Sequence, residues 1–231
     1  MARSSRKPSA PSQSSSSSED AFLARVVALS YWARERVHVL VVLGIAVVLV
    51  GVGAFYYYDQ RQADRQEAAD TLEGIHGLVE MGQEEEAHSE LEAFLDQYSG
   101  LPEALEARLL LGRVQLEEGN PEAAQVTLEP LAESMDDPVG LDGAFLLGHA
   151  YEELERWEEA EALYLRIHDE TPLTFQQRDA LEAAARARTE QGHHGQAAAL
   201  YEDILDLLEP GDPARPRFEM KLAEAQARAE G

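Results

Sequence analysis

The chain contains no cysteine and only two lysines, Lys7 and Lys221. Without cysteine it can form no disulfide framework, thiolate zinc site or catalytic thiol. Its 19 Lys and Arg residues stand against 44 Asp and Glu residues, a formal net charge of −25. Nucleic-acid-binding proteins concentrate basic residues against phosphates, so this balance argues against a nucleic-acid partner. At 45% hydrophobic, the 231 residues are too apolar for full disorder and can form a sizeable core.

One long apolar run interrupts this acidic composition. Residues 37–58 carry no formal charge over 22 positions. A helix of that length covers ~33 Å, enough for the ~30 Å hydrocarbon layer of a bilayer. Tyr56, Tyr57 and Tyr58 follow the run, where aromatic rings favour the membrane interface. We therefore predict a transmembrane helix over residues 37–58.

Two alternatives to this anchor remain at the level of sequence. The run could form a buried strand or core helix, although its length and flanking charges favour a membrane span. It could also belong to a cleaved signal peptide, because Val52, Gly53 and Ala54 are small enough for a signal peptidase. The long N-terminal region and long apolar core favour a retained anchor.

The residues before the span form two short segments. Residues 1–18 are rich in serine and contain proline, which is typical of a disordered tail. Residues 19–36 mix apolar side chains such as Phe22 and Trp32 with arginines such as Arg25, and we expect an amphipathic juxtamembrane segment.

The distribution of charge predicts the orientation of the anchor. Basic residues near the span are more numerous before it than after it, which favours a cytoplasmic N-terminus. Residues 59–231 hold 13 Lys and Arg against 41 Asp and Glu, a net charge of −28. We expect this acidic region to fold outside the cytoplasm, on the periplasmic side of a bacterial inner membrane. The absence of cysteine is compatible with an oxidising compartment.

The acidic region contains an internal repeat. Starting at Leu141, the residues Leu147, Gly148, Tyr151, Ala160, Tyr164 and Pro172 follow the spacing of a tetratricopeptide repeat (TPR). Small residues at Gly148 and Ala160 would let two antiparallel helices approach closely, while the large residues fill the space around the contact. Pro172 would stop the second helix.

The same register recurs along the region 59–231. The equivalent positions Ile75, Gly112, Gly148 and Ala185 are separated by 37, 36 and 37 residues. Gly119, Asn120 and Pro121 provide a helix end, a cap and a first turn between two helices. We predict an all-α TPR solenoid of about four helical hairpins with a C-terminal capping helix over residues 218–227. An ordinary helical bundle, the alternative, predicts no constant step.

The sequence contains no recognisable motif of a catalytic or cofactor-binding site. The seven histidines form no His-Glu-x-x-His pattern, and His193 and His194 follow Gly192 in what we expect to be a solvated turn. Acid pairs such as Glu158 and Glu159 are typical of the solvated face of a helix. We predict that the chain is not an enzyme and uses no cofactor and no metal.

A surface remains the most plausible site. In a TPR solenoid the first helix of each repeat lines the concave side, and positions one turn apart face inward. The register assigns eight residues to a candidate protein-binding groove: Leu72, His76, Leu109, Arg113, Phe145, His149, Glu182 and Arg186. The alternative is that Leu72, Leu109 and Phe145 belong only to the core. The Lys and Asn set with which some TPR modules clamp a C-terminal carboxylate is absent.

The order of these elements resembles the YfgM family. The resemblance rests on a short N-terminal part, one apolar span ending in Val-Gly-Val-Gly-Ala-Phe-Tyr-Tyr-Tyr, a helix from Asp59 and about four TPR-like units. That family is described as an ancillary subunit of the SecYEG translocon with a periplasmic TPR-like domain. The resemblance implies a single-pass inner-membrane adaptor that handles exported polypeptides together with the translocon or periplasmic chaperones, without ATP.

Two other functional classes remain. The chain could be an envelope-assembly or cell-division scaffold like the Tol-Pal-associated TPR proteins, and it could form a homo-oligomer through the helix after Asp59. A hydrolase would need an essential Asp or Glu that the sequence does not reveal. The acidic surface is compatible with a basic partner or with a salty habitat.

Overall fold

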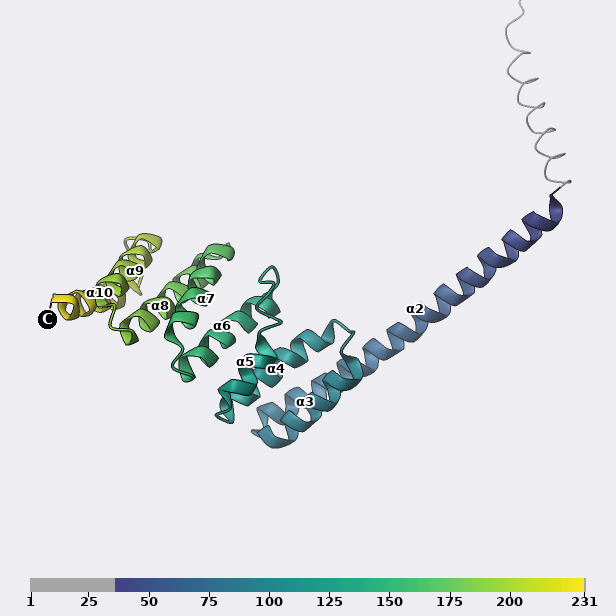
Figure 1. Cartoon of the computed structure of the whole chain (residues 1–231), viewed down its shortest axis with the longest axis horizontal. Coiled ribbons are helices and arrows are strands. Elements are labelled where there is room, and N and C mark those ends of the chain that lie inside the picture. Colours follow the sequence, from purple (N-terminus) through teal and green to yellow (C-terminus); the bar gives the residue numbers. More distant parts are fainter. Residues whose placement is uncertain (1–35, 231) are drawn as a thin grey trace, which may run out of the picture. The chain divides into compact units, whose positions relative to one another are not determined.

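The computed structural model describes residues 36–230, which form helices and the turns between them (Figure 1). The expected tail over residues 1–18 and nearly all of the juxtamembrane segment 19–36 lie outside the described residues. The described helices are α2 (Val37–Glu80), α3 (Glu84–Tyr98), α4 (Glu103–Glu117), α5 (Pro121–Leu128), α6 (Pro138–Glu153), α7 (Trp157–Glu170), α8 (Thr174–Glu190), α9 (His194–Leu207) and α10 (Arg215–Glu230).

The chain divides into two compact units, Met1–Gln62 and Ala63–Gly231, and the boundary falls within α2. In the described part of the first unit, the apolar residues of α2 are exposed. By length and composition α2 is suited to cross a membrane, although the same features occur in signal sequences.

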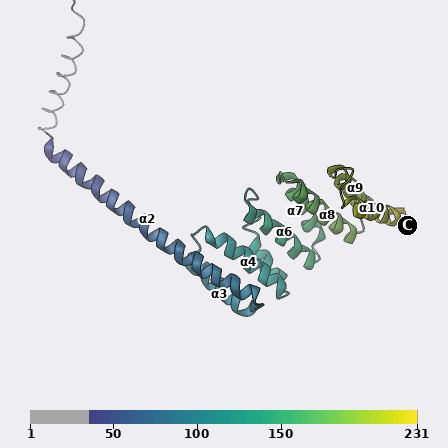
Figure 2. The same cartoon turned by 180° about the vertical axis from the view of Figure 1, so that it is seen from behind.

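The second unit is a TPR-like solenoid, which confirms the predicted fold class. Four hairpins follow one another: the end of α2 with α3, α4 with α5, α6 with α7, and α8 with α9. Figures 1 and 2 show these helices in succession from both sides. The additional helix α10 packs on α9 and buries Phe218 completely, so the last hairpin is covered as a capped solenoid requires.

Each of the last three hairpins is closed by a small residue against a large one. Gly112 in α4 faces Leu128 in α5, and Gly148 in α6 faces Tyr164 in α7. A Cβ atom at Gly148 would lie 2.5 Å from Tyr164 Cε1, well inside van der Waals contact. In the fourth hairpin the equivalent positions are Ala185 and Tyr201, both buried. The predicted close approach at Gly148 is thus present.

The turns inside the hairpins share one backbone conformation. Gly82, Gly119 and Gly192 have φ angles of 71°, 72° and 78°, the left-handed region that glycine enters without steric penalty. The third hairpin has Glu155 at this position, with φ 56°. The next residue, Arg156, donates its backbone N–H to the carbonyl of Tyr151 at 2.8 Å, so the helix end keeps its hydrogen bond.

Most of the predicted helix boundaries are present. Asn120 caps α5 by accepting from the N–H of Ala123, and Pro121 occupies the first turn. Asp137 caps α6 by accepting from the N–H groups of Val139 and Gly140 at 2.9 and 3.0 Å. Thr174 and Phe175 belong to the first turn of α8.

The second helix of the second hairpin is short. α5 has 8 residues, whereas α3, α7 and α9 have 15, 14 and 14. Pro130, two residues after Leu128, cannot donate a helical hydrogen bond, so the helix stops at Leu128. The connector over residues 129–137 replaces the missing turns and buries Leu131 and Met135.

We expect Gly148→Ala to lower the free energy of unfolding by about 1–3 kcal/mol, because the new methyl group would overlap the Tyr164 ring. Gly74→Ala is the control: that position in α2 is open, so better helix propensity should raise stability by up to ~1 kcal/mol. Denaturant unfolding of the full chain, followed by circular dichroism, measures both. Equal stability of the two variants would contradict the close helix contact.

We expect Glu155→Gly to raise the free energy of unfolding by roughly 0.5–1 kcal/mol, since relief of the left-handed strain exceeds the entropic cost of glycine. No hydrogen bond or ion pair of the Glu155 side chain occurs among the described residues, so none is lost. The same unfolding measurement applies. Gly192→Ala, the converse change, should destabilise, and a stabilised Gly192→Ala variant would show that the turn conformation is not limiting.

Candidate protein-binding surface

The eight predicted groove residues occupy two equivalent positions on the first helix of each hairpin. Leu72, Leu109, Phe145 and Glu182, here called the first row, lie one turn before His76, Arg113, His149 and Arg186, the second row. The four members of each row come from α2, α4, α6 and α8. A regular register therefore relates the eight positions from hairpin to hairpin.

The first row is mostly structural. Leu72 is 4% exposed and belongs to the core, the alternative that the sequence left open. Leu109 and Phe145 are half-buried and pack against the larger core cluster, so each keeps part of its side chain accessible. Glu182 accepts a hydrogen bond from Arg217 at 2.6 Å and forms an ion pair with Lys221 at 3.4 Å. Only Leu109 and Phe145 supply accessible apolar surface.

The second row consists of two histidines and two arginines, and three of these four side chains have an acidic partner. His76 Nε2 lies 3.1 Å from Glu106, and His149 Nδ1 lies 3.5 Å from Glu153. Arg186 donates to Glu152 at 2.8 Å. Arg113 is exposed and has no ion-pair partner within residues 36–230. It is thus the second-row cation that is available to an incoming carboxylate or carbonyl group.

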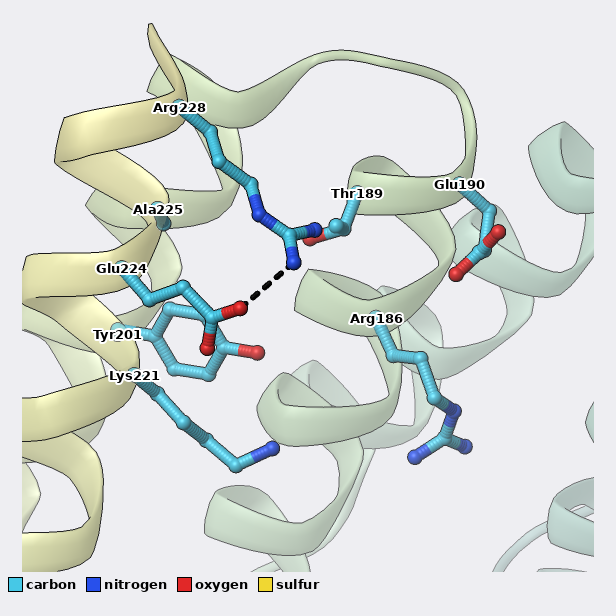
Figure 3. Close-up of a pocket in the computed structure, with 8 residues that line it drawn as sticks. All are labelled: Arg186, Thr189, Glu190, Tyr201, Lys221, Glu224, Ala225 and Arg228. Atoms are coloured by element: carbon cyan, nitrogen blue, oxygen red, sulfur yellow. Dashed lines mark hydrogen bonds and ion pairs between the residues drawn. The ribbon is translucent and has the colours of Figure 1, made fainter.

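Arg186 also lines a small cavity at the C-terminal end of the solenoid (Figure 3). The cavity encloses about 160 Å³ between α8, α9 and α10. In Figure 3 the side chains of Lys221 and Arg228 extend from α10 towards α8, and Arg228 donates to Glu224 at 2.7 Å. The sequence register missed this cavity, because residues 218–227 were predicted only as a cap and not as a wall.

Burial changes the acid–base behaviour of the tyrosines behind the surface. Burial, followed by the nearby charge of Glu152, raises the pKa of Tyr164 well above its ordinary value. Burial, followed by the charge of Glu129, likewise raises the pKa of Tyr151. Both hydroxyls stay protonated at neutral pH and can donate hydrogen bonds.

The first helices of the hairpins offer a regular surface for a partner. Within residues 36–230, no group of three His, Asp or Glu side chains is arranged to hold a metal ion. His193 is exposed at the turn after Gly192, as the sequence predicted, and occupies the N-cap position of α9 without a side-chain hydrogen bond. Partly apolar rows flanked by charges on a rigid solenoid are suited to contact a polypeptide.

Comparison with known proteins establishes the class. Residues 30–227 match the tetratricopeptide repeat-like domain family, and the chain belongs to that family. TPR-like domains are typically non-catalytic scaffolds that bind protein partners. A search of curated protein sequences gives no match.

Solved structures share the fold at low sequence identity. One is described as a "Podosopora anserina putative kinesin light chain nearly identical TPR-like repeats" structure, with a TM-score of 0.57 and 22% identity over 70% of this chain and 86% of the other. Another is a tetratricopeptide repeat protein from Parabacteroides merdae, with a TM-score of 0.59 and 16% identity over 71% and 62% of the two chains. These likenesses show the fold alone.

We expect the stability of the folded domain to fall above about pH 10, where an unfolded tyrosine loses its proton. The raised pKa means that the folded state keeps the Tyr164 proton there, so ionisation favours the unfolded state. The contribution of the protonated Tyr164 to the free energy of unfolding is complete below pH ~10. It is lost as the pH rises towards the pKa of Tyr164 in the folded state. Tyr164→Phe should flatten the decline, measured by denaturant unfolding over a pH series. An unchanged decline in the Tyr164→Phe variant would contradict the assignment.

Proposed function

We propose that this chain is a membrane-anchored TPR adaptor that binds polypeptides through the accessible residues of the two rows. The observation that carries the proposal is the placement of half-buried Leu109 one turn before the exposed Arg113, with half-buried Phe145 at the equivalent position of Leu109 in the next hairpin. Arg113 has no ion-pair partner within residues 36–230. Apolar contacts would provide affinity, and Arg113 would orient a carbonyl or carboxylate group of the partner.

The anchor would be the apolar part of α2 over residues 37–58. Its exposed Val, Leu and Ile side chains would be stable in lipid and unfavourable in water. The excess of basic residues before the span supports a cytoplasmic N-terminus, with the solenoid in the periplasm of a bacterium. The solenoid would then meet polypeptides as they emerge from the inner membrane.

The partner class follows from the resemblance to the YfgM family. By that resemblance, the adaptor would work beside the SecYEG translocon or with periplasmic chaperones and hold exported clients without covalent chemistry. Half-buried apolar side chains are appropriate for segments that have not yet folded, because such segments still expose apolar residues.

Photo-crosslinking in intact bacterial membranes tests this proposal. A benzophenone amino acid replaces Arg113 or Phe145, and Ala199, an exposed residue of α9, provides the matched control. We expect polypeptide adducts from the first two positions, identified by mass spectrometry, and far fewer from Ala199. Adducts restricted to lipid, or the same polypeptides from all three positions, would overturn the proposed site.

The same preparations report on the anchor. We expect full-length protein in the membrane fraction, as a retained span requires. Mature protein that begins near Phe55 would indicate a cleaved signal and would favour an envelope-assembly scaffold.

A further inference from the structure

A groove that is separate from the two rows lies next to the point where α5 ends. The groove measures about 490 Å³ and lies beside α6, α7 and the connector 129–137. None of the eight predicted residues lines it. Its volume is within the range of cavities that hold small ligands or several side chains of a bound peptide.

The groove has an apolar floor. Leu147 in α6 and Leu163 in α7 line it, with exposed fractions of 4% and 8%, and the half-buried ring of Tyr151 lies alongside. Ala162 in α7 is exposed at the same site and has only a methyl side chain, which leaves room for a partner. A partner's aliphatic side chain placed here would be removed from water.

The charges that remain at the groove are negative. Arg166 forms an ion pair with Glu170 at 3.0 Å and also donates to the carbonyl of Ala132. Glu159 is paired with Arg156 at 2.9 Å. Glu129 accepts only from the neutral amide of Gln125, and Glu133 has no partner within residues 36–230. Two exposed carboxylates therefore lack a cation next to an apolar floor.

We propose that this groove docks a cationic amphipathic segment of a partner protein, with an aliphatic side chain over Leu147 and Leu163 and a flanking Lys or Arg beside Glu129 and Glu133. Charge complementarity favours this occupant. A second copy of this chain is disfavoured, because residues 59–231 carry a net charge of −28 and would repel one another. The site is independent of the proposed function of the two rows.

The absence of cysteine permits a selective test, because one introduced cysteine is the only thiol. Ala162→Cys places it in the groove. Ala199→Cys places it at the equivalent exposed position of α9, one repeat later, as the matched control. Each full-length variant is equilibrated with mixed-disulfide peptides that carry a leucine flanked by lysines, a serine flanked by lysines, or a leucine flanked by glutamates. Mass spectrometry measures the captured fraction of each peptide.

We expect Ala162→Cys to capture the Lys-Leu peptide about tenfold more than either other peptide, a ratio that Ala199→Cys should not show. Adding Glu129→Gln and Glu133→Gln should bring the Lys-Leu and Glu-Leu peptides towards equal capture. The captured fractions of the three peptides are compared at the same cysteine, so a difference in reactivity between the two cysteines cancels. Circular dichroism verifies that every variant is folded.

Two outcomes would overturn the inference. Equal peptide ratios at the two cysteines would show that the groove has no selectivity. Equal capture of the Lys-Leu and Lys-Ser peptides at Ala162→Cys would indicate attraction to the acidic surface without docking of the apolar side chain. Neither outcome affects the crosslinks from Arg113 and Phe145, so the two sites fail separately.

Discussion

The close approach of two helices within the last three hairpins is the contact on which the solenoid depends. Gly148 lets α6 approach α7 until the Tyr164 ring occupies the space that a Cβ atom would need, and Gly112 does the same against Leu128. Once a hairpin is closed in this way, one apolar side remains for the next hairpin to cover. The step of 36 or 37 residues is thus a consequence of packing, and α10 is required because the last hairpin would otherwise expose its core.

This packing decides which residues of the first helices are available to a partner. A helix that is buried on the side of its own hairpin and against the next repeat leaves a narrow accessible strip. Leu72 is already inside the core at the N-terminal end, while Arg113 and His149 lie on the exposed strip. Ion pairs such as Arg186 with Glu152 link neighbouring hairpins there, but exposed pairs of this kind are each worth only about 0–1 kcal/mol. The apolar contacts, and not the charges, hold the strip in place.

Much of this architecture could be predicted from the sequence, because closure of a hairpin needs particular residue types at fixed separations. The pair Gly148 and Tyr164 predicts a close helix contact, because only a small residue leaves room for the ring. Asn120 followed by Pro121 predicts the start of a helix. The burial of Leu72 could not be predicted in the same way, since a leucine at that register position serves either the core or the groove. The walls of the small cavity depend on which face of α10 lies towards α8. The prediction of a capping helix over residues 218–227 does not specify that face. Glu155 was missed because glutamate, unlike glycine, gives no signal of a left-handed turn.

The irregular hairpin shows how a repeat protein can gain a new surface without losing its core. Pro130 removes the last turns of α5, but Leu131 and Met135 in the connector stay buried, so the apolar contacts of the missing turns are largely replaced. The outer surface differs at this place. Next to the shortened helix, α6 and α7 line a groove with Leu147 and Leu163 at its base. The buried side chains of the connector therefore keep the core closed where α5 is short, and the groove lies on the outside of the same connector.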